Sequence, residues 1–178
     1  PRPQSRRPST SLPQPILLLA LLALLTLYRL WAIPRLGVTL YIDEAQYWSW
    51  AQHPDWGYFS KPPVIAWLIG LATSLFGNGL LAVKLPSLVL YPATAWMVFL
   101  LGKALFDVRI GFRAGIAFAL IPLVSALGLA VSTDAPLMFF WTAAMLLFLR
   151  AVEHDRWRDW LLLGLAVGLG IMSKYTMA

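Results

Sequence analysis

Long apolar runs alternate along this chain with short segments that carry most of the charged residues. The first run, residues 15–33, gives a helix of about 19 residues, which at roughly 1.5 Å per residue crosses the hydrocarbon core of a bilayer. Pro92 and Pro122 fall inside later runs, which membrane helices tolerate because neighbouring groups satisfy the freed carbonyls. Four later runs predict further membrane helices, at residues 83–106, 111–131, 135–152 and 160–172.

The segment between the first two membrane helices, residues 34–82, has a different pattern. It mixes charged and aromatic residues with one apolar stretch, residues 63–77, of about 14 residues. Stretches of this length are more often interfacial or re-entrant than spanning. We therefore expect residues 63–77 not to cross the membrane, so that residues 34–82 form one loop between the first two membrane helices.

Composition places the chain among polytopic membrane proteins. Hydrophobic residues make up 60% of the 178 residues and charged residues 12%, whereas soluble domains are about 45–50% apolar and about 25% charged. The absence of cysteine excludes disulfides and thiolate metal sites. The net charge of +6 comes without a long basic run, so no nucleic-acid partner is expected.

The two ends of the chain set the expected domain organisation. Residues 1–14 are rich in Pro, Ser and Arg and are expected to form a disordered cytoplasmic tail. Residues 15–178 are expected to form one membrane-embedded domain. Because the chain starts at Pro1 and stops just after an apolar run, we expect it to be a fragment of a longer protein.

Basic residues indicate how the helices are oriented. Cytoplasmic segments of membrane proteins carry an excess of Lys and Arg. If residues 63–77 do not span, nine of the 14 basic residues fall in the tail and in the loops near 103–113 and 150–159. This predicts a cytoplasmic amino terminus and places loop 34–82 and residues 132–136 together on the outer face. The nine residues are Arg2, Arg6, Arg7, Lys103, Arg109, Arg113, Arg150, Arg156 and Arg158.

Three acids of this outer side are candidates for chemistry: Asp43, Glu44 and Asp134. Local sequence also allows an ordinary interpretation, in which Asp43 caps a helix that has Gln46 three residues later, and Asp134 starts a helix that has Pro136 in its first turn. A carboxylate at membrane depth is costly, however, and beside a polar cavity it can act as a general base. The residues alone leave capping and catalysis open.

Three lysines lie on the same predicted side of the membrane. Lys61 precedes two prolines, Lys84 starts the second membrane helix, and Lys174 follows the last one. Each side chain can extend to the headgroup level of the lipids, or it can bind a phosphate group. The prolines hold Lys61 on a rigid, extended segment.

Two further features have plain structural interpretations. Gly164 and Gly168 form a Gly-x-x-x-Gly pair, which predicts close helix packing and not a nucleotide-binding loop, because no strand precedes it. His53 and His154 are expected on opposite sides of the membrane, so they do not suggest a metal pair.

Five short motifs follow one another in a specific order: "DEAQYWSWA", "GYFSKPPVIAWLI", "AVKLPS", "STDAPLMFFW" and "GLGIMSKYT". With this order, the chain resembles the amino-terminal half of the GT-C membrane glycosyltransferases over residues 15–178. The most similar branch includes the protein O-mannosyltransferases and the lipid A aminoarabinose transferase. The resemblance implies an all-α polytopic membrane protein of GT-C type, with about five transmembrane helices in this chain and juxtamembrane helices in the first outer loop.

The resemblance also implies an activity. Such enzymes transfer a sugar from a polyprenyl-phosphate carrier to an acceptor on the outer face of the membrane, with inversion at the anomeric carbon. Asp43 matches the base, Asp134 matches a second acid, and Lys61 matches the residue that faces the carrier phosphate. We expect Glu44 to assist the acids, and Lys84 and Lys174 to assist Lys61. Flat faces for the sugar and the first isoprenes are expected from Tyr47, Trp48, Trp50, Trp56, Tyr58 and Tyr175.

One departure from the family concerns Ser60, where several relatives carry a glutamate that has been linked to a metal ion. We expect no metal at this position, and a divalent metal cofactor stays open. The main prediction is a glycosyltransferase of the bacterial inner membrane, surrounded by membrane lipids, with a lipid, glycan or protein acceptor. A transporter or flippase of a lipid-linked or anionic substrate is the alternative, because charged residues within membranes also mark transport paths.

Overall fold

The computed structural model describes residues 13–37 and 39–177. Within them the only regular elements are helices, which confirms the predicted all-α class. The predicted disordered tail, residues 1–14, lies outside the described residues except for its last two. Two short 3₁₀ helices, Ile33–Arg35 and Tyr175–Met177, follow α1 and α8. The α-helices are Gln14–Ala32 (α1), Ile42–Ala51 (α2), Val64–Phe76 (α3), Leu80–Leu105 (α4), Val108–Leu120 (α5), Pro122–Leu127 (α6), Asp134–His154 (α7) and Trp157–Ile171 (α8).

Three helical segments of the described chain are long and apolar enough to cross a membrane: Gln14–Arg35, Leu80–Leu105 and Asp134–His154. Two other helices of the bundle are shorter, α5 with 13 residues and α8 with 15, so their crossing of the membrane stays a prediction. The apolar stretch at 63–77 forms α3, a helix of 13 residues, which agrees with the expected juxtamembrane helix.

The helix predicted at 111–131 is divided in the structure. Helix α5 ends at Leu120, Ile121 takes an extended ψ of 126°, and Pro122 opens the six-residue helix α6. The residue before a proline is disfavoured in the helical region, whereas proline itself suits the first position of a helix. The prediction of one continuous helix is therefore wrong at this point. Pro92, by contrast, lies inside α4 as expected.

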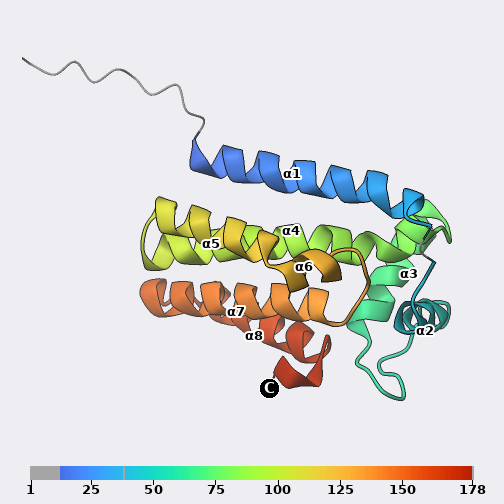
Figure 1. The fold of residues 1–178 in the computed structure, drawn as a ribbon. Coiled ribbons are helices and arrows are strands. Elements are labelled where there is room, and N and C mark those ends of the chain that lie inside the picture. Colours follow the sequence, from blue (N-terminus) through green and yellow to red (C-terminus); the bar gives the residue numbers. More distant parts are fainter. Residues whose placement is uncertain (1–12, 38, 178) are drawn as a thin grey trace, which may run out of the picture.

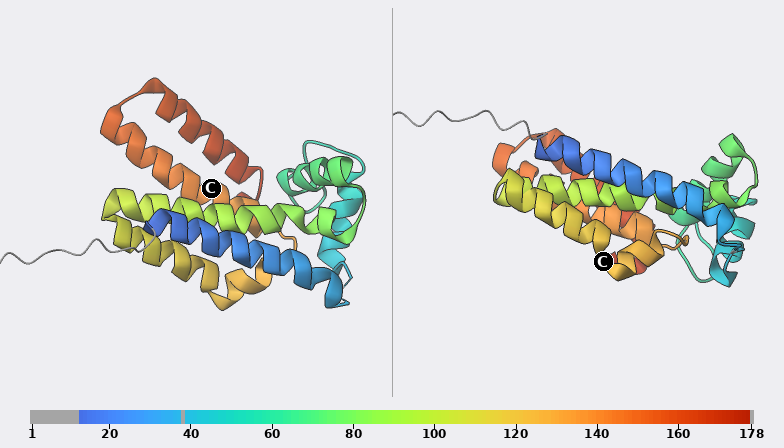
Figure 2. Two further views of the ribbon diagram at one scale, coloured as in Figure 1. Left: turned by 90° about the horizontal axis from the view of Figure 1, so that it is seen from above. Right: turned by 45° about the horizontal axis from the view of Figure 1, so that its top comes forward.

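The helices are arranged so that the two ends of the bundle differ. Figure 1 shows α1, α4, α5, α7 and α8 running side by side, with α2 and α3 gathered at one end. The connections from α4 to α5 and from α7 to α8 lie at the opposite end, and the two further views in Figure 2 show the same separation. Helix α4 is central, because it packs against α1, α3, α5 and α7.

A buried apolar cluster fixes α2 and α3 to the end of this bundle. It joins α2, α3, the start of α4 and the segment that precedes α7. Burying one large apolar side chain contributes about 1.5–3 kcal/mol, so this cluster is sufficient to hold the short helix α2 in place. Its buried members are Tyr47, Ala51, Ile65, Ile69, Val83 and Val131.

Close helix packing does not occur at the predicted pair, Gly164 and Gly168, but at other glycines. A Cβ atom added at Gly164 or Gly168 would meet no atom of the described chain within 4 Å, so the packing predicted for this pair is absent from the described structure. Between α4 and α5, in contrast, a Cβ at Gly111 would stand 2.5 Å from the carbonyl oxygen of Phe99 and 2.8 Å from the backbone nitrogen of Lys103. Glycine allows the backbones of α4 and α5 to touch there.

We expect Gly111→Ala to destabilise the protein by about 1–3 kcal/mol, because the new methyl group would push α5 away from rigid backbone atoms of α4. The midpoint of thermal unfolding in detergent measures the change. Gly164→Ala is the matched control, and it should leave the midpoint unchanged or slightly raise it, because alanine favours a helix. Equal loss of stability in both variants would contradict this account of the α4–α5 contact.

Candidate functional site

The polar residues singled out from the sequence meet at the end of the bundle that carries α2 and α3. Asp43 lies in the first turn of α2, Lys84 in the first turns of α4, and Asp134 at the first position of α7. Lys174 follows α8, and Lys61 precedes α3. Residues from distant parts of the sequence therefore lie at the same end of the bundle, because each stands near the start or the end of a helix.

Asp43 is exposed at this end of the molecule. No hydrogen bond or ion pair between described residues engages its carboxylate. The predicted capping box of Asp43 and Gln46 is wrong, because α2 begins two residues earlier than expected and Tyr41 occupies the cap position. The Tyr41 amide donates a hydrogen bond of 2.9 Å to the carboxylate of Glu44 instead. The carboxylate of Asp43 is thereby left available for a substrate.

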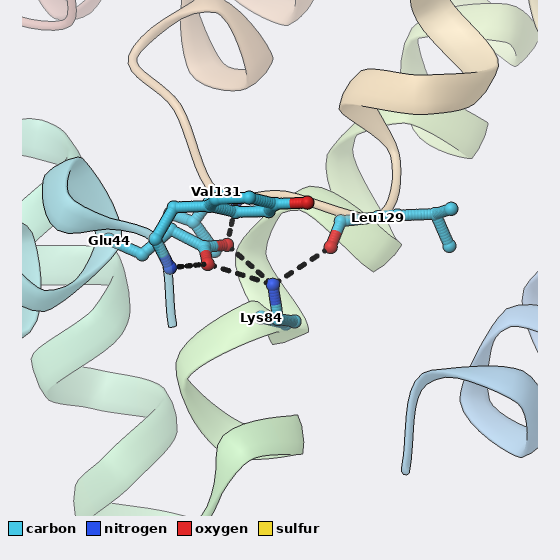
Figure 3. A network of polar contacts seen from close by, with 5 residues as sticks. Glu44, Lys84, Leu129 and Val131 are labelled. Carbon is cyan, nitrogen blue, oxygen red and sulfur yellow. Dashed lines mark hydrogen bonds and ion pairs between the residues drawn. The ribbon is translucent and has the colours of Figure 1, made fainter. Parts of the chain in front are cut away.

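Glu44 forms a buried ion pair with Lys84. Lys84 Nζ lies 2.7 Å from Glu44 Oε1 and 2.8 Å from Glu44 Oε2, and it also donates to the Leu129 carbonyl at 3.0 Å. The Val131 amide donates to Glu44 Oε1 at 2.6 Å. Figure 3 shows Lys84 between Glu44 and the Leu129 carbonyl, with Val131 above the carboxylate. One polar network thus connects α2, α4 and the segment between α6 and α7.

This network changes the roles predicted for its two charged members. The side chain of Lys84 is 3% exposed and that of Glu44 is 1% exposed. An ammonium group has three protons to donate, and the three contacts of Lys84 use them all. Neither group can reach a substrate without breaking the ion pair. We therefore infer that both residues stabilise the structure. The sequence had suggested a catalytic role for Glu44 and phosphate binding for Lys84.

A second ion pair is accessible. Lys174 Nζ lies 2.6 Å from Asp134 Oδ1, and the side chains are 33% and 30% exposed, respectively. The pair joins the start of α7 to the residues after α8. An ion pair with this exposure contributes only about 0–1 kcal/mol. A substrate group can therefore take the place of either partner at little cost.

Tyr47 shows that Asp43 and Asp134 share one neighbourhood. Its side chain is 3% exposed and packs in the apolar cluster below α2. Burial raises the pKa of the Tyr47 hydroxyl, and the negative charges of Asp43 and Asp134 raise it further. Both carboxylates therefore act electrostatically on the same hydroxyl group. Because the ring is buried, Tyr47 does not offer the flat face for a sugar that the sequence suggested.

The loop that carries Lys61 lies beside the end of α8. The Val64 amide donates to the Met172 carbonyl at 3.2 Å, which brings the start of α3 next to the segment that ends with Lys174. Lys61 is half-buried, and no ion pair with another described residue involves it. Its backbone carbonyl accepts a hydrogen bond of 3.1 Å from the Tyr58 amide.

The aromatic residues of this end differ in what they can offer. Trp50 and Tyr58 stack with their ring centres 4.8 Å apart and their planes within 6° of parallel. Trp48 is tied to Asn78 by a hydrogen bond from its indole nitrogen at 3.2 Å. Tyr175, beside Lys174, is 66% exposed. The rings other than Tyr47 are therefore at least partly exposed.

One charged residue of this region was not among the predicted site residues. Arg29 lies near the end of α1 and is only 3% exposed. Its signal in the sequence is a cation inside an otherwise apolar run, which in a membrane helix indicates a functional role by default. For metal ions, residues 13–37 and 39–177 bring together no group of three His, Asp or Glu side chains that could hold one.

Comparisons with known proteins identify the family of this chain. The sequence profile of the family described as dolichyl-phosphate-mannose-protein mannosyltransferase matches residues 60–178. The lipid A galacturonosyltransferase RgtD of Rhizobium johnstonii is 32% identical over 154 residues, which cover 84% of this chain and 33% of that protein.

Two further relatives share one activity by name, that of an undecaprenyl phosphate-alpha-4-amino-4-deoxy-L-arabinose arabinosyl transferase. The protein of Sodalis glossinidius is 35% identical over 126 residues and that of Pseudomonas aeruginosa strain UCBPP-PA14 is 29% identical over 127 residues. Each match covers 68% of this chain and 23% of the relative. The chain thus spans a quarter to a third of the length of these proteins. No solved structure matches it significantly.

We expect Glu44→Gln to lower the free energy of unfolding by about 3–5 kcal/mol, because it leaves the ammonium group of Lys84 buried without a counter-charge. The double variant Glu44→Gln with Lys84→Met should lose less than Glu44→Gln alone, since no buried charge remains. Thermal unfolding in detergent measures both. The exposed Glu153→Gln is the control, and a loss in the double variant equal to the sum of the single losses would contradict the pairing.

Proposed function

We propose that this chain, which belongs to the dolichyl-phosphate-mannose-protein mannosyltransferase family, carries catalytic residues of an integral membrane glycosyltransferase. The resemblance inferred from the five motifs is confirmed by this family match. The observation that carries the proposal is the exposed carboxylate of Asp43, which is free of partners in the described structure and shares a neighbourhood with Asp134. The transporter alternative receives no support, since the relatives described above are transferases by name.

The proposed reaction is one displacement at the anomeric carbon of a polyprenyl-phosphate-linked sugar. An acceptor hydroxyl attacks this carbon while its proton passes to the carboxylate of Asp43, which acts as general base. The bond between the anomeric carbon and the phosphate oxygen breaks, and its electron pair leaves with the phosphate. Attack opposite to the leaving group gives inversion.

The leaving phosphate needs stabilisation by positive charge more than it needs a proton. Lys61 suits this role, because it has no carboxylate partner among the described residues and stands on a segment stiffened by two prolines. Lys174 is the second candidate, and Asp134 would then be released to orient the acceptor or to stabilise positive charge on the sugar ring. The sugar and the first isoprenes would lie against Trp48, Trp50, Tyr58 and Tyr175.

The names of the relatives suggest the class of substrates. They describe transfer of galacturonic acid to lipid A and transfer of 4-amino-4-deoxy-L-arabinose from undecaprenyl phosphate. We propose a polyprenyl-phosphate sugar as donor and a glycolipid as acceptor for the protein that contains this chain.

We also propose a bacterial inner-membrane location, with the site on the outer face and the amino terminus in the cytoplasm. The distribution of charge supports this orientation. Six basic residues lie at or beside the helix connections at the end of the bundle opposite the site: Lys103, Arg109, Arg113, Arg150, Arg156 and Arg158.

We expect Asp43→Asn to reduce sugar transfer by about 10²–10⁴-fold, because the amide cannot accept the proton of the acceptor hydroxyl. The assay uses the full-length protein in membranes with a polyprenyl-phosphate sugar and a glycolipid acceptor. Asp55→Asn is a matched control, since Asp55 is an exposed acid of the same loop whose carboxylate accepts a hydrogen bond only from the adjacent Trp56 amide in the described structure. Full activity of Asp43→Asn at normal membrane insertion would refute the role of Asp43 as base.

A further inference from the structure

Arg29 holds the end of the short helix α6. Its Nη2 donates to the carbonyl of Ser125 at 3.2 Å and to the hydroxyl of the same residue at 3.3 Å. No carboxylate of the described residues lies within ion-pair distance of the guanidinium group. The carbonyl groups at the end of a helix carry partial negative charge, so they provide a favourable place for a cation. Arg29 therefore links α1 to the carboxyl end of α6.

Gly128 supplies the space for this guanidinium group. A Cβ atom at position 128 would stand 2.5 Å from Nη1 and 2.6 Å from Cζ of Arg29. The backbone of Gly128 has φ −68° and ψ −11°, a conformation that any residue adopts. Glycine at this position thus leaves room for the guanidinium group where it lies, and an added methyl group would force the end of the Arg29 side chain to shift.

The segment that follows is held at its other end by the buried ion pair. Lys84 binds the Leu129 carbonyl, and Glu44 binds the Val131 amide. Residues 125–131 are therefore fixed at one end by α1 and at the other by α2 and α4. Asp134 comes three residues after the second attachment, and its own amide is held only by the hydroxyl of Ser132, at 3.2 Å. The Asp134 carboxylate is paired with Lys174, and the position of its backbone depends on this segment as well as on the packing of α7.

We propose that Arg29 is a positioning residue for sugar transfer, which holds residues 125–131 so that the Asp134 carboxylate keeps its place at the end of the bundle that carries Asp43. This inference rests on the proposed function. Arg29 touches neither acid, and it acts through Ser125, Gly128 and the segment that leads to Asp134. An uncompensated cation in a membrane helix is costly, and this role gives a reason for its presence.

The test compares Arg29→Met and Gly128→Ala in the full-length protein. Both should lower kcat for sugar transfer by about 10- to 100-fold with little change in KM for the donor, because a small displacement of one acid affects the reacting geometry more than donor binding. Hydrogen–deuterium exchange of residues 125–134 should increase in both variants while exchange of α4 and α5 stays unchanged. The double variant should lose no more than the worse single one, since both changes break the same contact.

Two variants serve as controls. Arg35→Met removes a positive charge from the same end of α1, where Arg35 is exposed and bound only to its own segment, so activity and exchange should stay at the wild-type level. Arg29→Lys keeps the charge and one donor, so it should restore part of kcat.

Three results would overturn the proposal. They are wild-type kcat in Arg29→Met and Gly128→Ala, loss of kcat without faster exchange at residues 125–134, and faster exchange throughout the protein, which would indicate a role in global stability only. If the wild-type protein transfers no sugar, the proposed function is wrong. The exchange measurement then still decides whether Arg29 holds residues 125–131.

Discussion

The buried pair of Glu44 and Lys84 is the interaction on which the geometry of this end of the molecule depends. Two charged groups that are almost fully removed from water must keep fixed relative positions, because each needs its counter-charge and its hydrogen bonds. The pair fills these needs with one carboxylate, one ammonium group and the backbone of Leu129 and Val131. It thereby ties α2, α4 and the approach to α7 to a common point.

Adjacent acids take opposite roles around this point. Successive residues of a helix point about 100° apart, so burying Glu44 against α4 turns Asp43 toward the outside. Asp43 is exposed and has no ion-pair partner among the described residues, whereas Glu44 is buried and paired with Lys84. Across the site, Asp134 and Lys174 form a pair with partial access to solvent. The arrangement separates residues that hold the structure from residues that can meet a substrate.

Much of this could be predicted from the sequence. Apolar length indicated the helices of the bundle and the short helix α3, and the order of the motifs indicated the family, whose profile matches residues 60–178. Other details depend on contacts that no local pattern encodes. Gly164 and Gly168 have the spacing of a packing motif, yet the backbones approach at Gly111, because contact depends on which face of a helix meets its neighbour.

The sequence by itself therefore determined the class of fold and the family, because hydrophobic length and short motifs are local properties. Only the tertiary structure decided which charges are free. Glu44 and Lys84 are 40 positions apart, as are Asp134 and Lys174. Whether such residues neutralise each other or face a substrate depends on distances of a few ångströms between helices, and these are set by packing of the whole bundle.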